Sequence, residues 1–250
     1  MNFFARLRYL HRARKARRRG ERNEIQAILE LVKPGDTALD IGAHKGSYLY
    51  WLREAVGESG RVFAFEPQPA LATYLRDVVT TFRWTNVTVK NMGVSIAPAT
   101  LELNVPGATG AISPGASFES TVADRAECHT VRIDVTSLDA LYRSAEVPQF
   151  IKCDVEGHEL KVFQGGEKLL RRAHPALLFE CEARHLGKTP LREVFDTLTG
   201  WGYAGQFFTK DGLLPIAEFR QENHQSQSGP RFWDQPGYCN NFLFTAAPHA

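Results

Sequence analysis

The sequence predicts an α/β fold in which a mostly parallel sheet is covered by helices on both faces. Strand-length apolar runs alternate with segments of helical period along most of the chain, and this alternation is typical of sheets built from βαβ units. Two early apolar runs end in an acid, at Asp40 and Glu66, and the first of them opens directly into a glycine turn. The 250 residues suit one such domain with additional loops.

The elements follow in a regular order. Residues 3–19 form a basic segment with helical potential, and a helix from about 23 to 32 closes at Pro34-Gly35, a helix-stop signal. Seven apolar, β-prone runs are expected to be strands, at residues 37–41, 61–66, 86–92, 149–153, 176–181, 203–208 and 240–245. Helical patterns separate them, at residues 46–56, 69–82, 157–172 and 189–200. Right-handed crossovers are expected for the parallel pairs.

Two regions interrupt this alternation. Residues 101–105 and 130–135 alternate apolar and polar side chains, which favours two further strands. The segment between them, 106–129, is rich in Gly, Ser and Thr, and the segment 220–238 is rich in Gln, Ser and Asn. Loops of this length in a compact domain are usually lids or binding loops.

The first strand-to-helix turn has the composition of a nucleoside-cofactor site. Its pattern is D-x-G-x-x-x-G, from Asp40 through Gly42 to Gly46, and not the G-x-G-x-x-G of dinucleotide sites. An acid at the mouth of the turn repels a pyrophosphate but attracts a cofactor that carries a sulfonium and an amino group. The turn therefore predicts S-adenosylmethionine and not NAD. His44 and Tyr48 lie in the same turn and either touch this ligand or only pack there.

Further cofactor contacts are expected at the next strand ends. Glu66 is expected to bind the ribose hydroxyls, the alternative being that it only caps the helix after Pro67. The segment Asn91-Met92-Gly93 is expected to line the adenine pocket, unless Met92 is a core residue. The predicted cofactor-binding residues are Asp40, Gly42, His44, Gly46, Tyr48, Glu66, Pro67, Asn91, Met92, Gly93 and Asp154.

A second group of polar side chains follows two later strands. The strands near 149–153 and 176–181 lead into Asp154, Glu156, His158 and Glu180. In open α/β sheets ligands bind beyond the carboxyl ends of the strands, so these acids should meet Asp40 and Glu66 at one rim. Converging acids are costly unless a cation lies among them. A sulfonium cofactor, a basic substrate or a divalent metal would each supply that cation.

Seven motifs spread along the chain resemble those of a known family. They are DIGAHKGSY at 40–48, FAFEPQP at 63–69, the NV-to-GV stretch from Asn86 to Val94, SLDAL at 137–141, IKCDVEGHELKVFQGG at 151–166, HPALLFECE at 174–182 and NNFLF at 240–244. Together they resemble the FkbM family of S-adenosylmethionine-dependent methyltransferases. The resemblance implies the Rossmann-like class I methyltransferase fold, with a seven-stranded sheet whose last strand is antiparallel. It also implies O-methylation of sugars or other hydroxylated natural products.

The expected reaction is methyl transfer to a hydroxyl of a sugar, a glycolipid or another hydroxylated metabolite. Because a protonated alcohol is a poor nucleophile, a base or a metal should assist. The candidates are Asp154, Glu156, His158 and Glu180, each with a structural alternative as a helix cap, a surface histidine or a buried pair. If a metal takes part, Asp154 and Glu156 would hold Mg²⁺ and not zinc.

Two other functional classes stay open. A methyltransferase fold without chemistry could serve as a binding or assembly protein, although the intact acids and glycines argue against it. N- or nucleic-acid methyltransferases commonly carry an N/D-P-P-Y/F box after the fourth strand, where this chain has Asp154-Val155-Glu156-Gly157. We therefore expect a small-molecule or glycan acceptor and no nucleic acid.

Charge is unevenly distributed along the chain. Of the 30 Lys and Arg and the 28 acids, the first 22 residues hold nine and one, so the remainder has a net charge of −6. We divide the chain into a basic N-terminal arm or helix, 1–22, and a methyltransferase domain, 23–250, with loop insertions near 106–129 and 220–238. Residues 3–19 form either a solvated, partly disordered arm, a contact with an anionic membrane, or a nucleic-acid arm.

The sequence favours a cytoplasmic protein that is peripheral to the membrane if the basic segment binds there. No run approaches the roughly 18 to 20 apolar residues of a membrane span, and the N-terminus has no secretory apolar core. Four cysteines without C-x-x-C spacing, Cys128, Cys153, Cys181 and Cys239, are expected to be buried reduced thiols. The oligomeric state stays open, with a homodimer as one arrangement.

Overall fold

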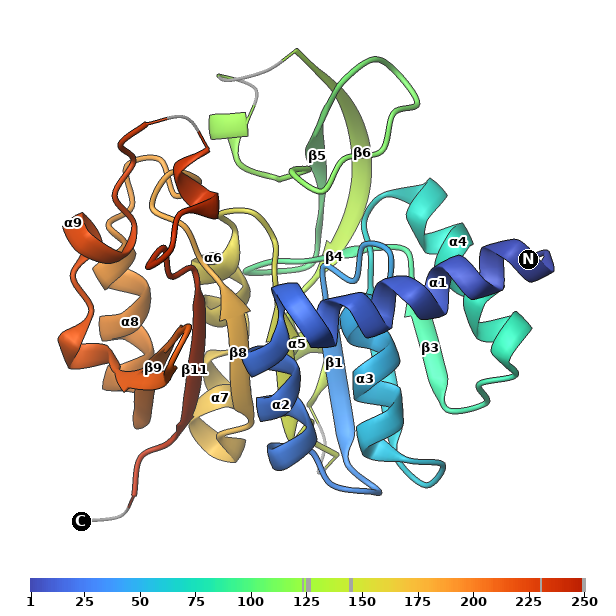
Figure 1. Ribbon diagram of the computed structural model, residues 1–250, viewed down its shortest axis with the longest axis horizontal. Coiled ribbons are helices and arrows are strands. Elements are labelled where there is room, and N and C mark those ends of the chain that lie inside the picture. The colour runs from blue at the N-terminus through green and yellow to red at the C-terminus, as the bar shows by residue number, and fades with distance from the viewer. Residues whose placement is uncertain (123, 125–126, 144–145, 230, 249–250) are drawn as a thin grey trace.

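The computed structural model describes residues 1–122, 124, 127–143, 146–229 and 231–248. Its centre is an eight-stranded sheet with the order β10-β9-β11-β8-β7-β1-β2-β3 (Figure 1). The strands are β1 (Thr37–Ile41), β2 (Arg61–Phe65), β3 (Val87–Lys90), β7 (Phe150–Cys153), β8 (Ala176–Glu180), β9 (Tyr203–Thr209), β10 (Gly212–Pro215) and β11 (Asn241–Ala246). β11 runs antiparallel to both β8 and β9, whereas β8, β7, β1, β2 and β3 are parallel.

The predicted fold class is confirmed, and all seven predicted strands are present. The eighth strand, β10, was not predicted. It pairs with β9 as an antiparallel hairpin across the two-residue turn Lys210-Asp211, and Asp211-Gly212 is itself a hairpin signal. The strand is short and partly exposed, so its apolar pattern is weak.

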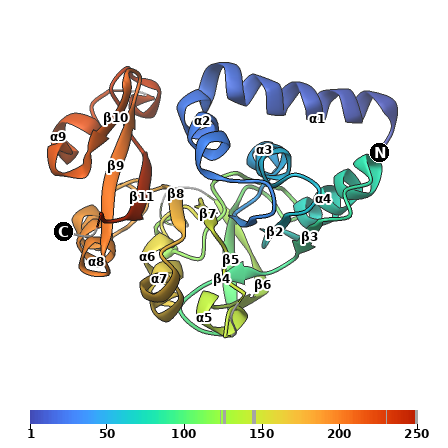
Figure 2. The same ribbon diagram turned by 90° about the horizontal axis from the view of Figure 1, so that it is seen from below.

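Helices cover both faces of the sheet (Figure 2). On one face lie α2 (Arg22–Leu31), α3 (Ser47–Val56) and α4 (Pro69–Phe82); on the other lie α6 (Glu159–Gln164), α7 (Glu167–Ala173) and α8 (Leu191–Gly200). The single helix expected at 157–172 is wrong, because α6 and α7 are separated at Gly165-Gly166. A side chain at Gly165 would place its Cβ 2.1 Å from the Ser95 carbonyl oxygen, so this break is needed for close backbone packing.

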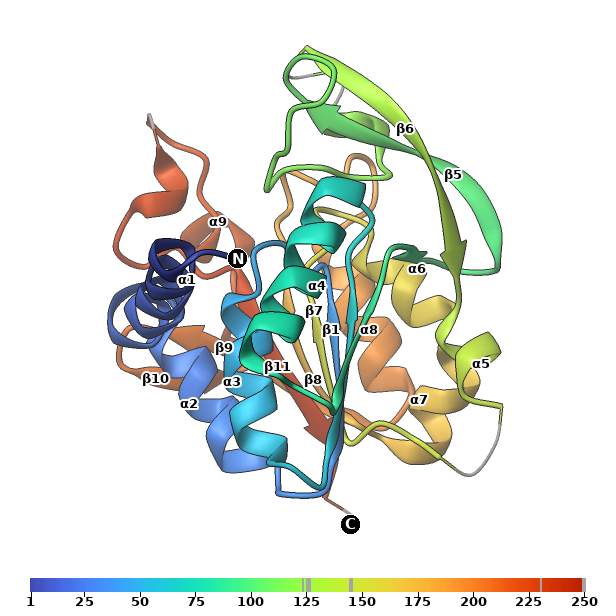
Figure 3. The same ribbon diagram turned by 90° about the vertical axis from the view of Figure 1, so that its right-hand side faces the viewer.

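A second, smaller sheet projects from the main one. It contains β4 (Gly93–Val94), β6 (Cys128–Thr136) and β5 (Ala99–Pro106), of which β5 and β6 form a long antiparallel hairpin. The two extra strands expected near 101–105 and 130–135 are therefore confirmed, and the short helix α5 (Leu138–Leu141) follows them. The hairpin carries the segment 106–129 above the carboxyl ends of the main strands (Figures 1 and 3).

Both long loops contain short helical turns. The segment 106–129 has the 3₁₀ turn Ser120–Val122, and residues 123 and 125–126 lie outside the described residues. The segment 220–238 has α9 (Gln221–His224) and the 3₁₀ turn Phe232–Asp234, and residue 230 is likewise outside them. A further 3₁₀ turn spans Ile216–Glu218.

The basic N-terminal segment is a packed helix. α1 (Phe3–Lys15) continues into a π-helical turn, Ala16–Gly20, and lies across α3 (Figure 2). Tyr9 is 1% exposed and its hydroxyl donates to the Gly46 carbonyl over 2.9 Å, while Trp51 Nε1 donates to the Ala13 carbonyl over 2.9 Å. The solvated, partly disordered arm considered above is therefore wrong. Over the described part of the chain, no helix combines the length and apolar character needed to cross a membrane.

The cysteine prediction holds for three residues of four. Cys153, Cys181 and Cys239 are buried at strand ends or in the adjoining loop, but Cys128 is half-buried at the start of β6. Cys128 lies at the hairpin tip, where only one face of the strand is covered.

Candidate functional site

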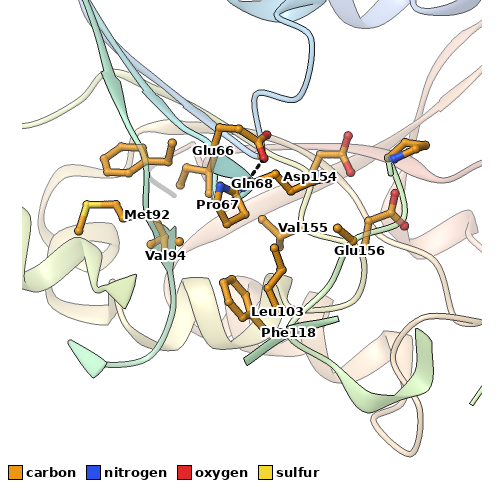
Figure 4. A pocket seen from close by; sticks show the side chains of 16 residues that line it. Glu66, Pro67, Gln68, Met92, Val94, Leu103, Phe118, Asp154, Val155 and Glu156 are labelled. Atoms are coloured by element: carbon orange, nitrogen blue, oxygen red, sulfur yellow. Dashed lines mark hydrogen bonds between the residues drawn. The ribbon is translucent and has the colours of Figure 1, made fainter. Parts of the chain in front are cut away.

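A pocket opens at the carboxyl ends of β1, β2 and β7. Its empty volume is about 510 Å³, including the part open to solvent. The carboxylates of Glu66, Asp154 and Glu156 lie along one side in Figure 4, and apolar side chains that include Met92 and Phe118 lie on the other. The pocket therefore offers an apolar slot beside a row of acids.

The glycine turn after β1 forms one wall. Gly42 has φ +80°, and a Cβ there would lie 1.8 Å from the Asp154 carbonyl oxygen, so only glycine fits. The amides of Gly42 and Ala43 both donate to the Phe65 carbonyl, which ties the turn to β2. Gly46 also has a positive φ, but its Cβ would meet Leu75 and Tyr9, so it packs behind the turn and does not line the pocket.

Glu66 lies at the end of β2 with its side chain 2% exposed. Its two oxygens accept the amides of His44 (2.7 Å) and Gln68 (2.9 Å). Burial raises the pKa of Glu66 to about 7, and these two amides oppose the rise. The carboxylate therefore joins the glycine turn to the start of α4 and still has lone pairs for a ligand. The predicted capping and ligand roles are compatible in this geometry.

The segment after β3 supplies the apolar side of the pocket. Met92 and Gly93 line it together with Pro67. Asn91 does not line it, because its Nδ2 donates to the carbonyls of Glu66 (3.0 Å) and Pro67 (2.9 Å). Asn91 thus fixes the backbone that carries Glu66.

A buried charge cluster lies below the rim. Lys152 is 4% exposed and its Nζ lies 3.1 Å from Asp154 Oδ2. Burial alone would lower the pKa of Lys152, but Asp154 and Asp40 raise it above its ordinary value. Asp40 is fully buried, and neither of its carboxylate oxygens has a hydrogen-bond partner among the described residues, although the Leu49 amide lowers its pKa. Burial raises the pKa of Asp40 to about 6, against the charge of Lys152.

Two turn residues border this cluster. The Tyr48 ring lies 4.8 Å from Lys152 Nζ, and burial raises the pKa of its hydroxyl. His44 has φ +45°, and its buried Nε2 has no hydrogen-bond partner among the described residues. Burial lowers the pKa of His44 to about 4, so the ring is neutral near pH 7. Neither side chain lines the pocket of Figure 4.

Two acids near this cluster were not predicted from the sequence. Glu21 precedes α2 and Glu24 lies in its first turn. Burial raises the pKa of Glu24 to about 7 and that of Glu21 above its ordinary value, and the charges of Lys152 and Asp154 act on Glu21. No local signal distinguishes these acids from ordinary first-turn helix acids, because only the packing of α2 brings them here.

The turn after β7 brings Glu156 together with His185. Glu156 has φ +55°, an uncommon conformation for a residue other than glycine. Its Oε2 lies 2.8 Å from His185 Nδ1. The buried Glu159 carboxylate holds the turn by accepting the amides of Val155 and Gly157. Burial raises the pKa of Glu156, the hydrogen bond to His185 lowers it, and the charge of Asp154 raises it further.

His185 was missed by the sequence analysis. It lies five residues after the end of β8, in the segment that follows Glu180. A side chain at Gly157 would place its Cβ 2.5 Å from the His185 carbonyl, so the two turns are in direct backbone contact. Because ligands bind beyond the carboxyl ends of the strands, residues shortly after a strand are candidates for the site. His185 could have been found by examining as many residues after β8 as after β7.

The segment 106–129 is hydrogen-bonded to the turn that contains Glu156 and to the turn that contains His185. Ser117 Oγ donates to the Glu156 carbonyl (2.7 Å), and Thr121 Oγ1 donates to the His185 carbonyl (2.9 Å). Gln68 exchanges two hydrogen bonds with the backbone of Ser113, so the segment also contacts the cofactor side. In this structure it closes over the pocket.

His158 occupies a different place from the one expected for a base. It is 1% exposed, with Nδ1 2.6 Å from Glu119 Oε1 and Nε2 2.8 Å from Ser95 Oγ. Because both ring nitrogens are occupied and the ring does not line the pocket, the catalytic interpretation of His158 disagrees with the geometry. The positive-φ turn at Glu156-Gly157 directs the histidine toward the hairpin and away from the rim.

Glu180 lies at the end of β8 but outside the pocket of Figure 4. Its Oε1 accepts from Asn240 Nδ2 over 2.9 Å. Burial raises the pKa of Glu180 well above its ordinary value, and the charges of Asp154 and Glu156 add to the rise. The predicted convergence of acids is therefore real, but Glu180 contacts Asn240, the residue before β11.

The predicted metal ligands are engaged with other partners. Asp154 pairs with Lys152, and Glu156 is hydrogen-bonded to His185. Among the residues that the structure describes, no three His, Cys, Asp or Glu side chains are grouped as a metal site would require. The buried Asp40, the Gly42 cradle and the apolar slot instead fit a cationic nucleoside cofactor.

Comparison with known proteins supports this interpretation. The family described as the methyltransferase FkbM domain matches residues 40–204. The hexuronic acid methyltransferase AglP of Haloferax volcanii is 31% identical over 155 residues, which cover 59% of this chain and 56% of that protein. Ribosomal RNA large subunit methyltransferase E of Syntrophobacter fumaroxidans is 41% identical over 66 residues, 25% of this chain and 34% of that one.

A solved structure shows the same fold. The methyltransferase FkbM of Methylobacillus flagellatus KT superimposes with a TM-score of 0.53 and 19% identity, covering 88% of this chain and 50% of that one. The chain therefore spans only about half the length of these relatives, or less.

Proposed function

Because this chain belongs to the FkbM family and is an S-adenosylmethionine-dependent methyltransferase, we propose that it methylates a hydroxyl of a sugar, a glycolipid or another hydroxylated metabolite. The observation that carries the proposal is the carboxylate of Glu156, which lines the pocket beside Asp154 and is paired with His185. An alcohol must lose its proton as it attacks, and this pair is built to take it. The hexuronic acid methyltransferase among the relatives is an independent argument for a sugar acceptor.

The pocket divides into three parts for the cofactor. Glu66 is placed for the ribose hydroxyls, and Met92 with Phe118 forms the slot for the adenine. The Gly42 turn and the buried Asp40 are placed for the cationic methionine end. The bound cofactor supplies an electrophilic methyl group next to a sulfonium.

We assign the base to His185. When Nδ1–H donates to Glu156, the lone pair of Nε2 is available to accept the hydroxyl proton of the acceptor. The hydroxyl oxygen forms the new bond to the methyl carbon, the carbon–sulfur bond breaks, and its electron pair stays on sulfur as a neutral thioether. Glu156 is then a positioning residue that fixes the tautomer of His185. Asp154 contributes negative charge near the reacting centre.

The kinetics of three variants test this assignment. His185→Gln should lower kcat by about 10²- to 10⁴-fold, the usual contribution of a general base, while KM for the cofactor changes little. Glu156→Gln should also lower kcat while KM for the cofactor changes little. His158→Gln is the matched control, since that histidine is buried and does not line the pocket; it should retain most of the wild-type kcat. An unchanged kcat in His185→Gln would transfer the role to another group.

We further propose that catalysis needs no Mg²⁺. Asp154 already has a cation as its partner, and Glu156 already has a hydrogen-bond donor.

We also propose that the protein works at the cytoplasmic face of a membrane. At the N-terminal end of α1, three apolar side chains are exposed beside arginines: Phe3 (68%), Phe4 (78%) and Leu7 (47%). Apolar side chains among cationic ones favour the surface of an anionic bilayer.

One experiment tests the proposed function as a whole. Labelled methyl transfer from S-adenosylmethionine into metabolite, glycan and glycolipid extracts is followed by mass spectrometry, with Asp154→Asn as the inactive control. A methyl ether on a hydroxyl supports the proposal. Label on RNA or on an amine would favour a nucleic-acid or N-methyltransferase. Cofactor binding by calorimetry with no transfer to any pool would favour a binding or assembly protein.

A further inference from the structure

A cluster of arginines surrounds the C-terminal end of α1. Arg14, Arg17, Arg18 and Arg22 line an open hollow together with Trp51. The Arg17 guanidinium carbon lies 4.6 Å from the centre of the Trp51 ring, so this arginine is held in place by a cation–π contact. A second hollow shares Arg22 with it. Its other charged lining residues are Arg19, Lys210 and the acid Glu24, and its wall includes residues 233 and 235–241.

In the part of the chain that the structure describes, these guanidinium groups form no ion pair, whereas arginines such as Arg53, Arg171 and Arg192 do. Glu21, the one acid of the first 22 residues, is partly buried, and the charges of Lys152 and Asp154 act on it. Glu24 lines the second hollow, and burial raises its pKa to about 7. The positive charges of the cluster therefore outnumber the acids beside it, which favours binding of an external anion.

The second hollow leads from the cluster to acids that follow β8. Arg22 lines both hollows, and Asn240 in the second one donates to Glu180 at the end of β8. Tyr238 in the same wall donates to Glu182, three residues before His185. An acceptor lying in the second hollow would thus have the arginines at one end and the segment that leads to His185 at the other.

The chemistry of the walls indicates the kind of ligand. Guanidinium groups bind carboxylates and phosphates with two parallel hydrogen bonds. The neutral side chains between the arginines and the rim include Asn23, Gln235 and Asn241, which can donate to and accept from sugar hydroxyls. The two features together match a carbohydrate that carries an oxyanion.

We propose that the arginine cluster binds the carboxylate or phosphate of an anionic carbohydrate acceptor, which places a hydroxyl of the same molecule at the catalytic rim. This inference rests on the proposed function for the identity of the reacting group. The binding step itself is independent of methyl transfer. Uronic acids and sugar phosphates are the two sources of the anion, and they are compared directly below.

The test measures equilibrium binding of galacturonate, glucose 6-phosphate and neutral galactose to the full-length protein by calorimetry, with adenosylhomocysteine present. The anionic sugars should bind at least about tenfold more tightly than galactose, with an advantage that shrinks as salt rises. The double variant R17Q/R22Q should lose that advantage and keep its affinity for adenosylhomocysteine. R8Q is the matched control, because Arg8 is exposed on the same helix and lies outside both hollows; it should bind like the wild type.

The comparison of the two anionic sugars identifies which anion the cluster binds. Preference for galacturonate or for glucose 6-phosphate identifies a carboxylate or a phosphate, and either preference supports the proposal. Equal affinity for galactose and both anionic sugars would overturn it. Loss of binding to phosphatidylglycerol vesicles by R17Q/R22Q, with sugar binding unchanged, would also overturn it in favour of a lipid headgroup. Retained anion binding without methyl transfer to any of these sugars would instead point to a failure of the proposed function.

Discussion

Cofactor binding should release a proton from Glu66. The side chain is 2% exposed, and burial raises its pKa from 4.5 to about 7 against two opposing amides. Because the folded-state pKa lies above the unfolded one, the folded protein binds more protons than the unfolded chain between these values. The contribution of Glu66 to stability is therefore fully present below about pH 4.5 and is lost as the pH rises through about 7.

The size of the effect follows from the same shift. Ionising Glu66 in the ligand-free protein costs about 3 kcal/mol, since each pKa unit corresponds to about 1.4 kcal/mol. Two ribose hydroxyls that donate to the carboxylate would each stabilise its charged form by about 1.5–3 kcal/mol at most. These terms are comparable, so binding should shift Glu66 to the ionised form. At pH 6 this group alone should release about one proton.

Calorimetry in buffers of different ionisation enthalpy counts the released protons. Glu66→Gln has no proton to release, so the count at pH 6 should fall by about one and the affinity by at least about tenfold. Glu119→Gln is the control: burial would raise the pKa of Glu119, but hydrogen bonds from His158 and Lys161 lower it to about 2. Equal proton release by the wild type and Glu66→Gln would refute the placement of Glu66 on the ribose.

Four further outcomes are expected. Gly42→Ala should abolish cofactor binding measured by calorimetry, because its Cβ would lie 1.8 Å from the Asp154 carbonyl oxygen; retained binding would mean that the turn can move. EDTA should leave the initial rate of methyl transfer unchanged, and restoration of a lost rate by Mg²⁺ would contradict the metal-free mechanism. Hydrogen exchange in the segment 106–129 should slow on binding adenosylhomocysteine, whereas equal rates would make it a passive connector. Tyr9→Phe should lower the free energy of unfolding by about 1 kcal/mol through the lost bond to Gly46, which thermal denaturation measures, and an unchanged midpoint would exclude that contribution.

The strands of the main sheet other than β10, and the acids at their ends, could be predicted because their signals are local. An apolar run that ends in an acid and a glycine, as at Asp40 and Gly42, specifies both a strand and its carboxyl end. Parallel strands place all their carboxyl ends at one edge, so the approximate position of Glu66 and Asp154 follows from topology alone. The break between α6 and α7 falls at Gly165-Gly166, a local helix-breaking signal that the single-helix prediction did not use. The close approach of Gly165 to the Ser95 backbone explains why glycine is needed there.

The two histidines show where sequence reasoning failed at the site. His158 lies within the motif at 151–166, at the predicted rim, and was therefore considered a base. The direction of its side chain is fixed by the positive φ of Glu156 and by the contact with Glu119 in another segment. His185 lies in the loop after β8, and its position depends on contacts with Gly157, Thr121 and Glu156. Side-chain direction at a rim depends on which loops meet there, and a single sequence does not contain that information.

The N-terminal helix links the arginine cluster to the cofactor turn. Arg12 donates to the Lys45 carbonyl (2.9 Å) and Tyr9 to the Gly46 carbonyl, so α1 holds the start of α3 from outside. Trp51 on α3 contacts both Ala13 and Arg17, and therefore joins the arginine cluster to the same helix that begins at the glycine turn. An anion bound by the cluster and a cofactor bound by the turn would thus act on one packed unit. Variants that loosen this unit at Tyr9 should weaken both ligands together, whereas R17Q/R22Q should weaken only the anion.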